Sequence, residues 1–191
     1  MSIAHNILMR MFGRPRGSLG RLGGVIMART NRRCAVWVVD LLCIQPNDRV
    51  LEVGFGPGVG IELLSKAVPT GYVAGVDASM EMVDQATARN AQAIESGRVE
   101  LRHGCAENIP FEDNTFDKIL AINSMQVWPD VVAGLREMQR VLKAGGKIAL
   151  GFTPYSGRSK NGVAETLKVS GFVEAGIVES DIGFCAMALK P

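Results

Sequence analysis

Short apolar runs alternate with amphipathic stretches along most of the chain, beginning at Arg49. Runs rich in Val, Ile and Leu predict buried strands, and stretches with apolar residues three or four positions apart predict helices. Repeated units of this kind are typical of a mostly parallel sheet with helices on both faces. The pattern predicts strands over residues 49–53, 72–77, 99–103, 116–122, 147–152, 172–179 and 184–190.

Polar caps and glycines mark where the predicted helices begin and end. Ser79 is a suitable N-cap for a long helix reaching Ser96, and Asp130 caps a helix reaching Leu142, where two glycines would stop it. Further helices are predicted over residues 31–44, 59–66 and 162–170. We therefore expect an α/β fold. Its core would be a Rossmann-like, doubly wound sheet of seven strands, mostly parallel, with an antiparallel strand from the C-terminal hairpin at one edge.

Length and charge suit one domain preceded by a basic segment. At 191 residues, 47% of them hydrophobic, the chain can bury one sizeable core but leaves no room for a separate substrate domain. Seven arginines and no acidic residue stand before Asp40, whereas the whole chain has a net charge of only +2. We expect residues 1–30 to form a basic arm and residues 31–191 to form the domain. Three roles for the arm stay open: a lid, contact with a membrane surface or an amphiphilic acceptor, and contact with nucleic acid.

The cysteines argue against a metal site or a disulfide framework. There are four of them, no two form a C-x-x-C pair, and the chain has only two histidines. Free thiols are typical of a reducing compartment. We therefore expect a cytoplasmic protein that holds no metal.

Four glycines at alternate positions follow the first predicted strand, in the sequence VLEVGFGPGVG. Glycines let the backbone approach a ligand closely, and the helix that follows offers free N–H groups. A dinucleotide site would require G-x-G-x-x-G, and no register of this loop supplies the third glycine. In addition, Glu52 would repel a pyrophosphate. Asp77 ends the second strand nineteen residues after Gly58, where an acid binds the ribose of an adenine nucleoside. The pattern predicts an adenosine-like ligand without phosphates.

Five stretches of the chain resemble successive motifs of the class I S-adenosylmethionine-dependent methyltransferases. The resemblance is to the small-molecule branch, which includes the quinone-biosynthesis C-methyltransferases, and it spans residues 31–191. It implies a domain that binds S-adenosylmethionine as cofactor and transfers a methyl group to a small, hydrophobic acceptor. The stretches are VLEVGFGPG, GVDAS, GCAENIPF, FDKILAINSMQVWPD and RVLKAGGKIAL.

The same resemblance implies which residues hold the cofactor. The glycine loop and the acid before it would surround the methionine part, Asp77 the ribose, and the GCAENIPF stretch the adenine. Asn123 would face the sulfonium and amino-acid end through its backbone or its side chain. The cofactor-binding residues implied in this way are Glu52, Gly54, Gly56, Gly58, Asp77, Ala106, Glu107 and Asn123.

Two departures from the family pattern affect the chemistry. Cys105 stands where the family usually has an aspartate that accepts from the adenine amino group, and Gln126 and Val127 stand where histidines often occur. No catalytic base is indicated, although methyl transfer needs one only when the acceptor must first lose a proton. A non-catalytic cofactor-binding module, acting as a partner or regulator, is therefore the alternative function. Methylation of nucleic-acid bases is disfavoured because no [DN]-P-P-[YFW] stretch follows the fourth strand.

Overall fold

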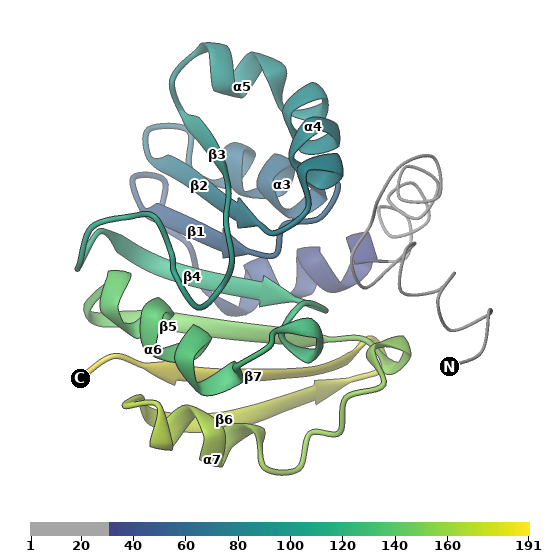
Figure 1. Ribbon diagram of the computed structural model, residues 1–191, viewed down its shortest axis with the longest axis vertical. Helices are drawn as coiled ribbons and strands as arrows, with labels where there is room; N and C mark the ends of the chain where they lie inside the picture. Colours follow the sequence, from purple (N-terminus) through teal and green to yellow (C-terminus); the bar gives the residue numbers. More distant parts are fainter. Residues whose placement is uncertain (1–30) are drawn as a thin grey trace.

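The computed structural model describes residues 31–191, so the predicted arm, residues 1–30, lies outside the described part. Seven strands form one sheet in the order β3-β2-β1-β4-β5-β7-β6 (Figure 1). Strands β1 to β5 are parallel, whereas β7 pairs antiparallel with both β5 and β6. The strands are β1 (Arg49–Val53), β2 (Tyr72–Asp77), β3 (Val99–His103), β4 (Phe116–Ile122), β5 (Leu142–Phe152), β6 (Val173–Ser180) and β7 (Gly183–Leu189).

The helices cover both faces of this sheet, and the predicted fold class is confirmed. One difference concerns the C-terminal hairpin, because β6 is the edge strand and the antiparallel strand β7 lies inside it. The labelled helices are α3 (Val59–Ala67), α4 (Met80–Arg89), α5 (Ala91–Glu95), α6 (Val131–Val141) and α7 (Val163–Val169), with single 3-10 turns at η2 (Met125–Val127) and η3 (Pro154–Ser156). An earlier helix covers residues 31–41, three residues shorter than predicted at its C-terminal end.

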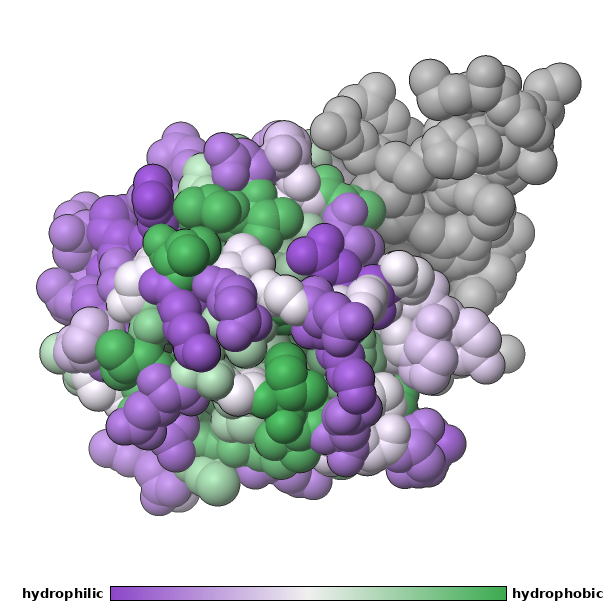
Figure 2. Space-filling view, turned by 90° about the horizontal axis from the view of Figure 1, so that it is seen from below, coloured by the Kyte–Doolittle hydropathy of each residue, from purple (hydrophilic) through white to green (hydrophobic). Residues whose placement is uncertain are grey.

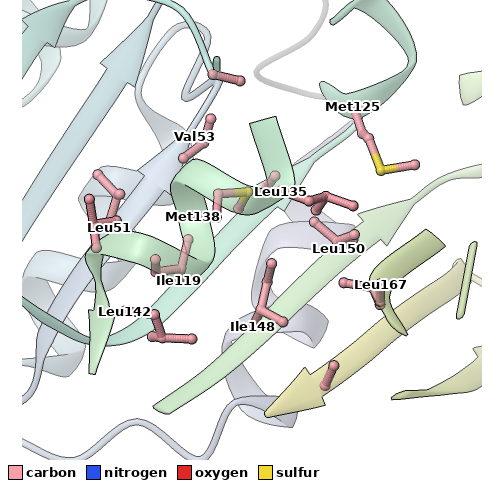
Figure 3. Packing of buried hydrophobic residues seen from close by; sticks show 14 of the residues in the cluster. Leu51, Val53, Ile119, Met125, Leu135, Met138, Leu142, Ile148, Leu150 and Leu167 are labelled. Atoms are coloured by element: carbon pink, nitrogen blue, oxygen red, sulfur yellow. The ribbon is translucent and has the colours of Figure 1, made fainter. Parts of the chain in front are cut away.

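Successive apolar residues of the strands point to opposite faces of the sheet and fill two cores, one on each face. On one face Leu135 and Met138 of α6 pack against strand residues such as Leu51 and Ile119 (Figure 3). On the other face α3, α4 and the helix at 31–41 cover a second cluster, which includes Val50. Neighbouring residues of β1 thus enter opposite cores, which is why β1 reads as a continuous apolar run.

The predicted single helix from Ser79 to Ser96 is wrong, because the structure divides it at Asn90. Asn90 has φ −109° and ψ 17°, outside the helical region. Its side-chain amide donates to the carbonyls of Ala86 at 2.9 Å and Gly58 at 3.2 Å. A side chain that bonds the backbone in this way competes with continuation of the helix.

The start of the fifth strand also differs from the prediction. The two glycines expected to stop α6 belong to β5, which begins at Leu142 opposite Phe116. Gly145 donates to the carbonyl of Lys190 at 2.9 Å, and Lys190 donates to Gly146 at 3.0 Å. Pairing of Leu142 with Phe116 therefore sets the start of β5, and the bonds to Lys190 hold the two glycines within the strand.

The edge of the sheet formed by β6 has features that disfavour pairing with another chain. Along β6 the exposed Val173 and Val178 are accompanied by Glu174 and Glu179. Glu174 has φ +52° and lies in a register shift between β6 and β7. Charges and irregular backbone both disfavour edge-to-edge association. Seen from this side, the surface carries separate hydrophobic groups between hydrophilic ones (Figure 2).

The helix at 31–41 packs directly on the sheet at a glycine. A Cβ on Gly151 of β5 would lie 2.5 Å from Cγ2 of Val38 and 3.5 Å from Sγ of Cys34. The absence of a side chain thus allows this helix to approach the sheet closely. In residues 31–191, no helix is long and apolar enough to cross a membrane.

We expect Gly151→Ala to lower the free energy of unfolding by about 1–3 kcal/mol, because the added methyl group forces Val38 and its helix away from β5. Urea denaturation of the two proteins measures this difference. Gly176→Ala is the matched control, since a Cβ on Gly176 of β6 meets nothing within 4 Å. Equal loss of stability in both variants would contradict the close approach of the helix.

Candidate active site

A cavity of about 590 Å³ opens at the carboxyl ends of β1, β2 and β4. The sheet order reverses there, because β2 and β3 extend to one side of β1 and β4 and β5 to the other (Figure 1). Such a switch point is where open α/β sheets bind ligands. The volume lies within the range of small-molecule sites. Seven of the eight predicted cofactor residues line the cavity, namely Glu52, Gly54, Gly56, Asp77, Ala106, Glu107 and Asn123.

The glycine loop after β1 has a backbone that other residues adopt only with strain. Gly54, Gly56 and Gly58 have φ values of +74°, +53° and +79°. A Cβ on Gly54 would collide with the side chain of Ser124, whereas one on Gly56 would meet nothing within 4 Å. Gly56 therefore presents bare backbone to the cavity. The eighth predicted residue, Gly58, does not line it and instead contacts α4.

Glu52 is a buried carboxylate at the floor of the cavity. Its side chain is 3% exposed, and its Oε2 has no hydrogen-bond partner in the described part of the chain. The first turn of α3 lies against it, because a Cβ on Gly60 would collide with both carboxylate oxygens. Burial, together with the nearby carboxylate of Asp77, raises the pKa of Glu52 to about 8, although the N–H of Ile61 donates to it.

Asp77, at the end of β2, ties the glycine loop to the second strand. Its Oδ2 accepts from the N–H of Gly56 at 2.8 Å, and its Oδ1 accepts from the N–H of Ser79 at 2.9 Å. Burial raises the pKa of Asp77, while these two N–H groups and His103 oppose the shift. Each oxygen still has capacity to accept from a ligand, because a carboxylate offers about four acceptor positions.

The adenine end predicted by the resemblance is built on α6. Ala106 is nearly buried, and a Cβ on Gly134 would lie 3.2 Å from its methyl group and 2.9 Å from Cε3 of Trp128. Oε1 of Glu107 accepts from the N–H of Asp130 at 3.1 Å. The Glu107 carboxylate thus holds the start of α6, and both Ala106 and Glu107 line the cavity. Cys105 lines the cavity beside them, and its side chain is exposed.

Asn123 directly follows β4 in a left-handed conformation, with φ +48°. Its Oδ1 accepts from the N–H of Thr153 at 2.9 Å. Its Nδ2 donates to Asn31 and to the Thr153 hydroxyl, both at 3.0 Å. The side chain is therefore engaged in holding the helix at 31–41 and the end of β5 together. Of the two routes predicted for Asn123, contact through the backbone fits this arrangement better.

Sequence reasoning missed several lining residues. Asn31 reaches the cavity from the first turn of a helix that precedes the motifs, and His103 from the end of β3, where its ring nitrogen lies 3.2 Å from the carbonyl of Ala78. Ser124 donates to the carbonyl of Val53 at 2.9 Å and holds β1 and β4 together. Ser124 and His103 had a local signal, because both lie at the ends of predicted strands. Asn31 had none, because only the tertiary structure brings its helix to the cavity.

The polar groups that line the cavity indicate which ligand it can hold. It combines two carboxylates, bare glycine backbone and the N-terminus of α3, and burial of Glu52 without a cation is unfavourable. A ligand with an ammonium group would supply that cation, and a ribose would supply hydroxyl donors to Asp77. The residues therefore fit S-adenosylmethionine. Among residues 31–191, no group of three or more His, Cys, Asp or Glu side chains could hold a metal ion.

Comparison with known proteins agrees with this fit. Residues 50–146 match a family model described as a methyltransferase domain. An uncharacterized methyltransferase of Bacillus subtilis, YdaC, is 31% identical over 185 residues, which cover 89% of this chain and 98% of YdaC. The chain therefore belongs to the methyltransferase domain family. It is a class I S-adenosylmethionine-dependent methyltransferase of the small-molecule branch.

Two further relatives are informative. A demethylmenaquinone methyltransferase of Staphylococcus aureus is 36% identical over 129 residues, covering 67% of this chain, and the match spans only 52% of that relative. The solved structure of a SAM-dependent methyltransferase from Aquifex aeolicus is 25% identical with a TM-score of 0.74, covering 84% of this chain and 93% of that one. The family membership confirms the predicted cofactor, S-adenosylmethionine.

The ligand-free protein should lose stability as pH rises between about 4.5 and about 8 because of Glu52. The folded-state pKa lies above the unfolded value, so the folded protein binds more protons in this window, and stability falls by up to about 1.4 kcal/mol per pH unit. Urea denaturation at a series of pH values measures the slope. Glu52→Gln keeps the shape and removes the titration, so its stability should vary less over the same window. Parallel slopes would contradict the raised pKa.

Proposed function

We propose that this methyltransferase acts in the cytoplasm on a small, hydrophobic acceptor. The observation that carries the proposal is the apolar rim of the cavity. Met80 is 53% exposed and Val127 is 37% exposed, and both line the same cavity as the two carboxylates. Large apolar side chains left in water at a site entrance favour a partner that buries them. A polar acceptor would gain nothing from this rim.

The proposed placement of the cofactor follows the polar groups of the cavity. Glu52 accepts from the ammonium group, and the loop from Gly54 to Gly56 lies along the methionine part. Asp77 accepts from the ribose hydroxyls. The backbone of Ala106 meets the adenine, with Trp128 packed behind it against α6.

The chemistry needs little from the protein beyond positioning. S-adenosylmethionine, when bound, supplies a methyl group already activated by its sulfonium. Glu52 and the glycine loop would orient that end, and Asn123 would fix the backbone beside it through its bonds to Asn31 and Thr153. Ile122 and Val127 would exclude water around the acceptor. Positioning and exclusion of water can account for much of the acceleration of an in-line displacement.

The quinone-related relatives support a hydrophobic acceptor. The best-supported class is a demethylated quinone, because the demethylmenaquinone methyltransferase above matches the cofactor domain over two thirds of this chain. Residues 1–30 would close over the cavity as a lid, and their arginines would also favour a membrane surface where such an acceptor resides. Asn31, which follows this segment in the sequence, lines the cavity.

Asp77→Ala should weaken binding of S-adenosylmethionine by about 1–3 kcal/mol, because the ribose hydroxyls and the Gly56 N–H lose their acceptor. Isothermal titration calorimetry measures the change. Asp84→Ala is the control, since Asp84 is an exposed acid on α4 that does not line the cavity. Unchanged affinity in Asp77→Ala would mean that the ribose is held elsewhere.

The acceptor class is tested by supplying methyl-labelled S-adenosylmethionine with a short-chain demethylmenaquinone, a hydrophobic phenol and a polar amine. We expect labelled product from the hydrophobic acceptors only. Met80→Asp should lower kcat/KM for them by about tenfold while leaving S-adenosylhomocysteine affinity unchanged. An acid at this first helical position suits the helix dipole, so stability should hold.

Val169→Asp is the control for Met80→Asp, because it also replaces an exposed apolar side chain with an acid. Val169 is 66% exposed on α7 and does not line the cavity. The Val169→Asp variant should therefore keep the kcat/KM of the unchanged protein. Transfer to the polar amine alone, or equal loss in both variants, would contradict the proposed acceptor class.

A further inference from the structure

Two side chains from the end of α4 hold the outer side of the glycine loop, away from the cavity. Nε of Arg89 donates to the carbonyl of Pro57 at 2.9 Å, and Nδ2 of Asn90 donates to the carbonyl of Gly58 at 3.2 Å. Asn90 is 4% exposed, so its amide is committed to these contacts. The loop is therefore bonded on both sides, because Gly56 donates to Asp77 on the inner side.

These bonds determine which way the peptide groups of the loop point. A trans peptide places its N–H opposite its C=O. The Gly58 carbonyl accepts from Asn90 and from the N–H of Glu62 at 3.1 Å in the first turn of α3. This orientation directs the N–H of Val59 away from α4, and Val59 lines the cavity. The N–H of Gly58 is fixed as well, since it donates to the carbonyl of Phe55 at 3.1 Å.

Contact with α4 also explains why position 58 is a glycine. A Cβ there would lie 2.7 Å from both Cβ of Ala86 and Nδ2 of Asn90. The loop thus touches α4 with no space for a side chain, and α4 ends at this contact. Asn90 interrupts the helix where its amide can reach two carbonyls, one of its own helix and one of the loop.

Glu62 of α3 connects Arg89, which holds the glycine loop, to the helix at 31–41. It lies 3.6 Å from Arg89 and 3.7 Å from Arg32, which belongs to the helix at 31–41. These ion pairs pull the pKa of the Glu62 carboxyl down, after the larger effect of its hydrogen bond with Lys66. Three helices around the loop therefore share one partly exposed carboxylate.

We propose that Arg89 and Asn90 are positioning residues that hold the glycine loop in the conformation that receives the methionine part of the cofactor. Neither residue lines the cavity, so each acts through the backbone of Pro57 or Gly58. The inference rests on the proposed placement of the cofactor. In that placement the adenosine part contacts Asp77 and Ala106, and Asp77 bonds to Gly56 and Ser79 rather than to Arg89 or Asn90.

The test compares two ligands that differ in the amino-acid part. S-adenosylhomocysteine contains it, whereas 5′-methylthioadenosine keeps the adenosine and lacks it. Arg89→Met preserves the aliphatic stem and removes the donors, and Asn90→Asp is isosteric and places an acceptor against two carbonyls. Arg136→Met is the matched control, because Arg136 is an exposed arginine within α6 that does not line the cavity.

We expect S-adenosylhomocysteine to bind about tenfold more weakly to Arg89→Met and to Asn90→Asp, and 5′-methylthioadenosine to bind both as it binds the unchanged protein. Amide hydrogen exchange of the loop in the ligand-free variants should be faster. Arg136→Met should change none of these quantities. Arg89 is partly exposed, so its variant tests the proposal even where Asn90→Asp fails to fold.

Two results would overturn the proposal: equal weakening of both ligands, which a general structural role predicts, and unchanged affinity for both. A third result would count against the proposed function instead of the roles of Arg89 and Asn90. If the unchanged protein binds neither ligand, the proposed placement of the cofactor is wrong, whatever the variants do.

Discussion

The hydrogen bond from the Gly56 N–H to the carboxylate of Asp77, 2.8 Å long, is the contact on which the site depends. It joins the loop after β1 to the end of β2 across the carboxyl edge of the sheet. Three residues of this loop have positive φ, so the loop needs tertiary contacts to define one conformation. Asp77 supplies one on the cavity side, while Arg89 and Asn90 supply others on the α4 side. With both sides held, bare backbone can face a ligand.

The two buried acids of the site lower the stability of the ligand-free protein and favour binding of a ligand that carries an ammonium group. Glu52 and Asp77 are two acids brought close together in a largely buried place, and burial raises the pKa of each. Glu52 is held there by dense packing, since the first turn of α3 meets its oxygens at a glycine. A protein selected for stability alone would not bury a carboxylate whose Oε2 has no hydrogen-bond partner in the described part of the chain. Local departures of this kind are expected where a ligand completes the structure.

Outside the motifs, the helix at 31–41 connects the site to the rest of the fold. It approaches β5 at Gly151, and Oδ1 of Asn31 in its first turn accepts from the Asn123 side-chain amide. The side chain of Asn123 is thereby committed to structure, and Glu107 is committed in the same way to the start of α6. Residues that a motif assigns to ligand binding thus also fasten the elements that carry them. Family membership gives the cofactor, whereas these bonds explain how this chain forms its site.

Local pattern determined most of the fold and much of the site. Near-continuous apolar runs mark the central strands, because these strands are buried on both faces of the sheet. The glycine loop follows one such strand and Asp77 ends another, at positions that the pattern predicts. Other features depend on contacts between segments far apart in the sequence. The helix break at Asn90, the early start of β5 and the role of Gly58 each arise where one segment bonds to or packs against a distant one. The sequence by itself determined which residues lie at the carboxyl edge of the sheet; only the tertiary structure decided which of them face the cavity, because hydrogen bonds to distant partners set the orientation of each side chain and peptide group.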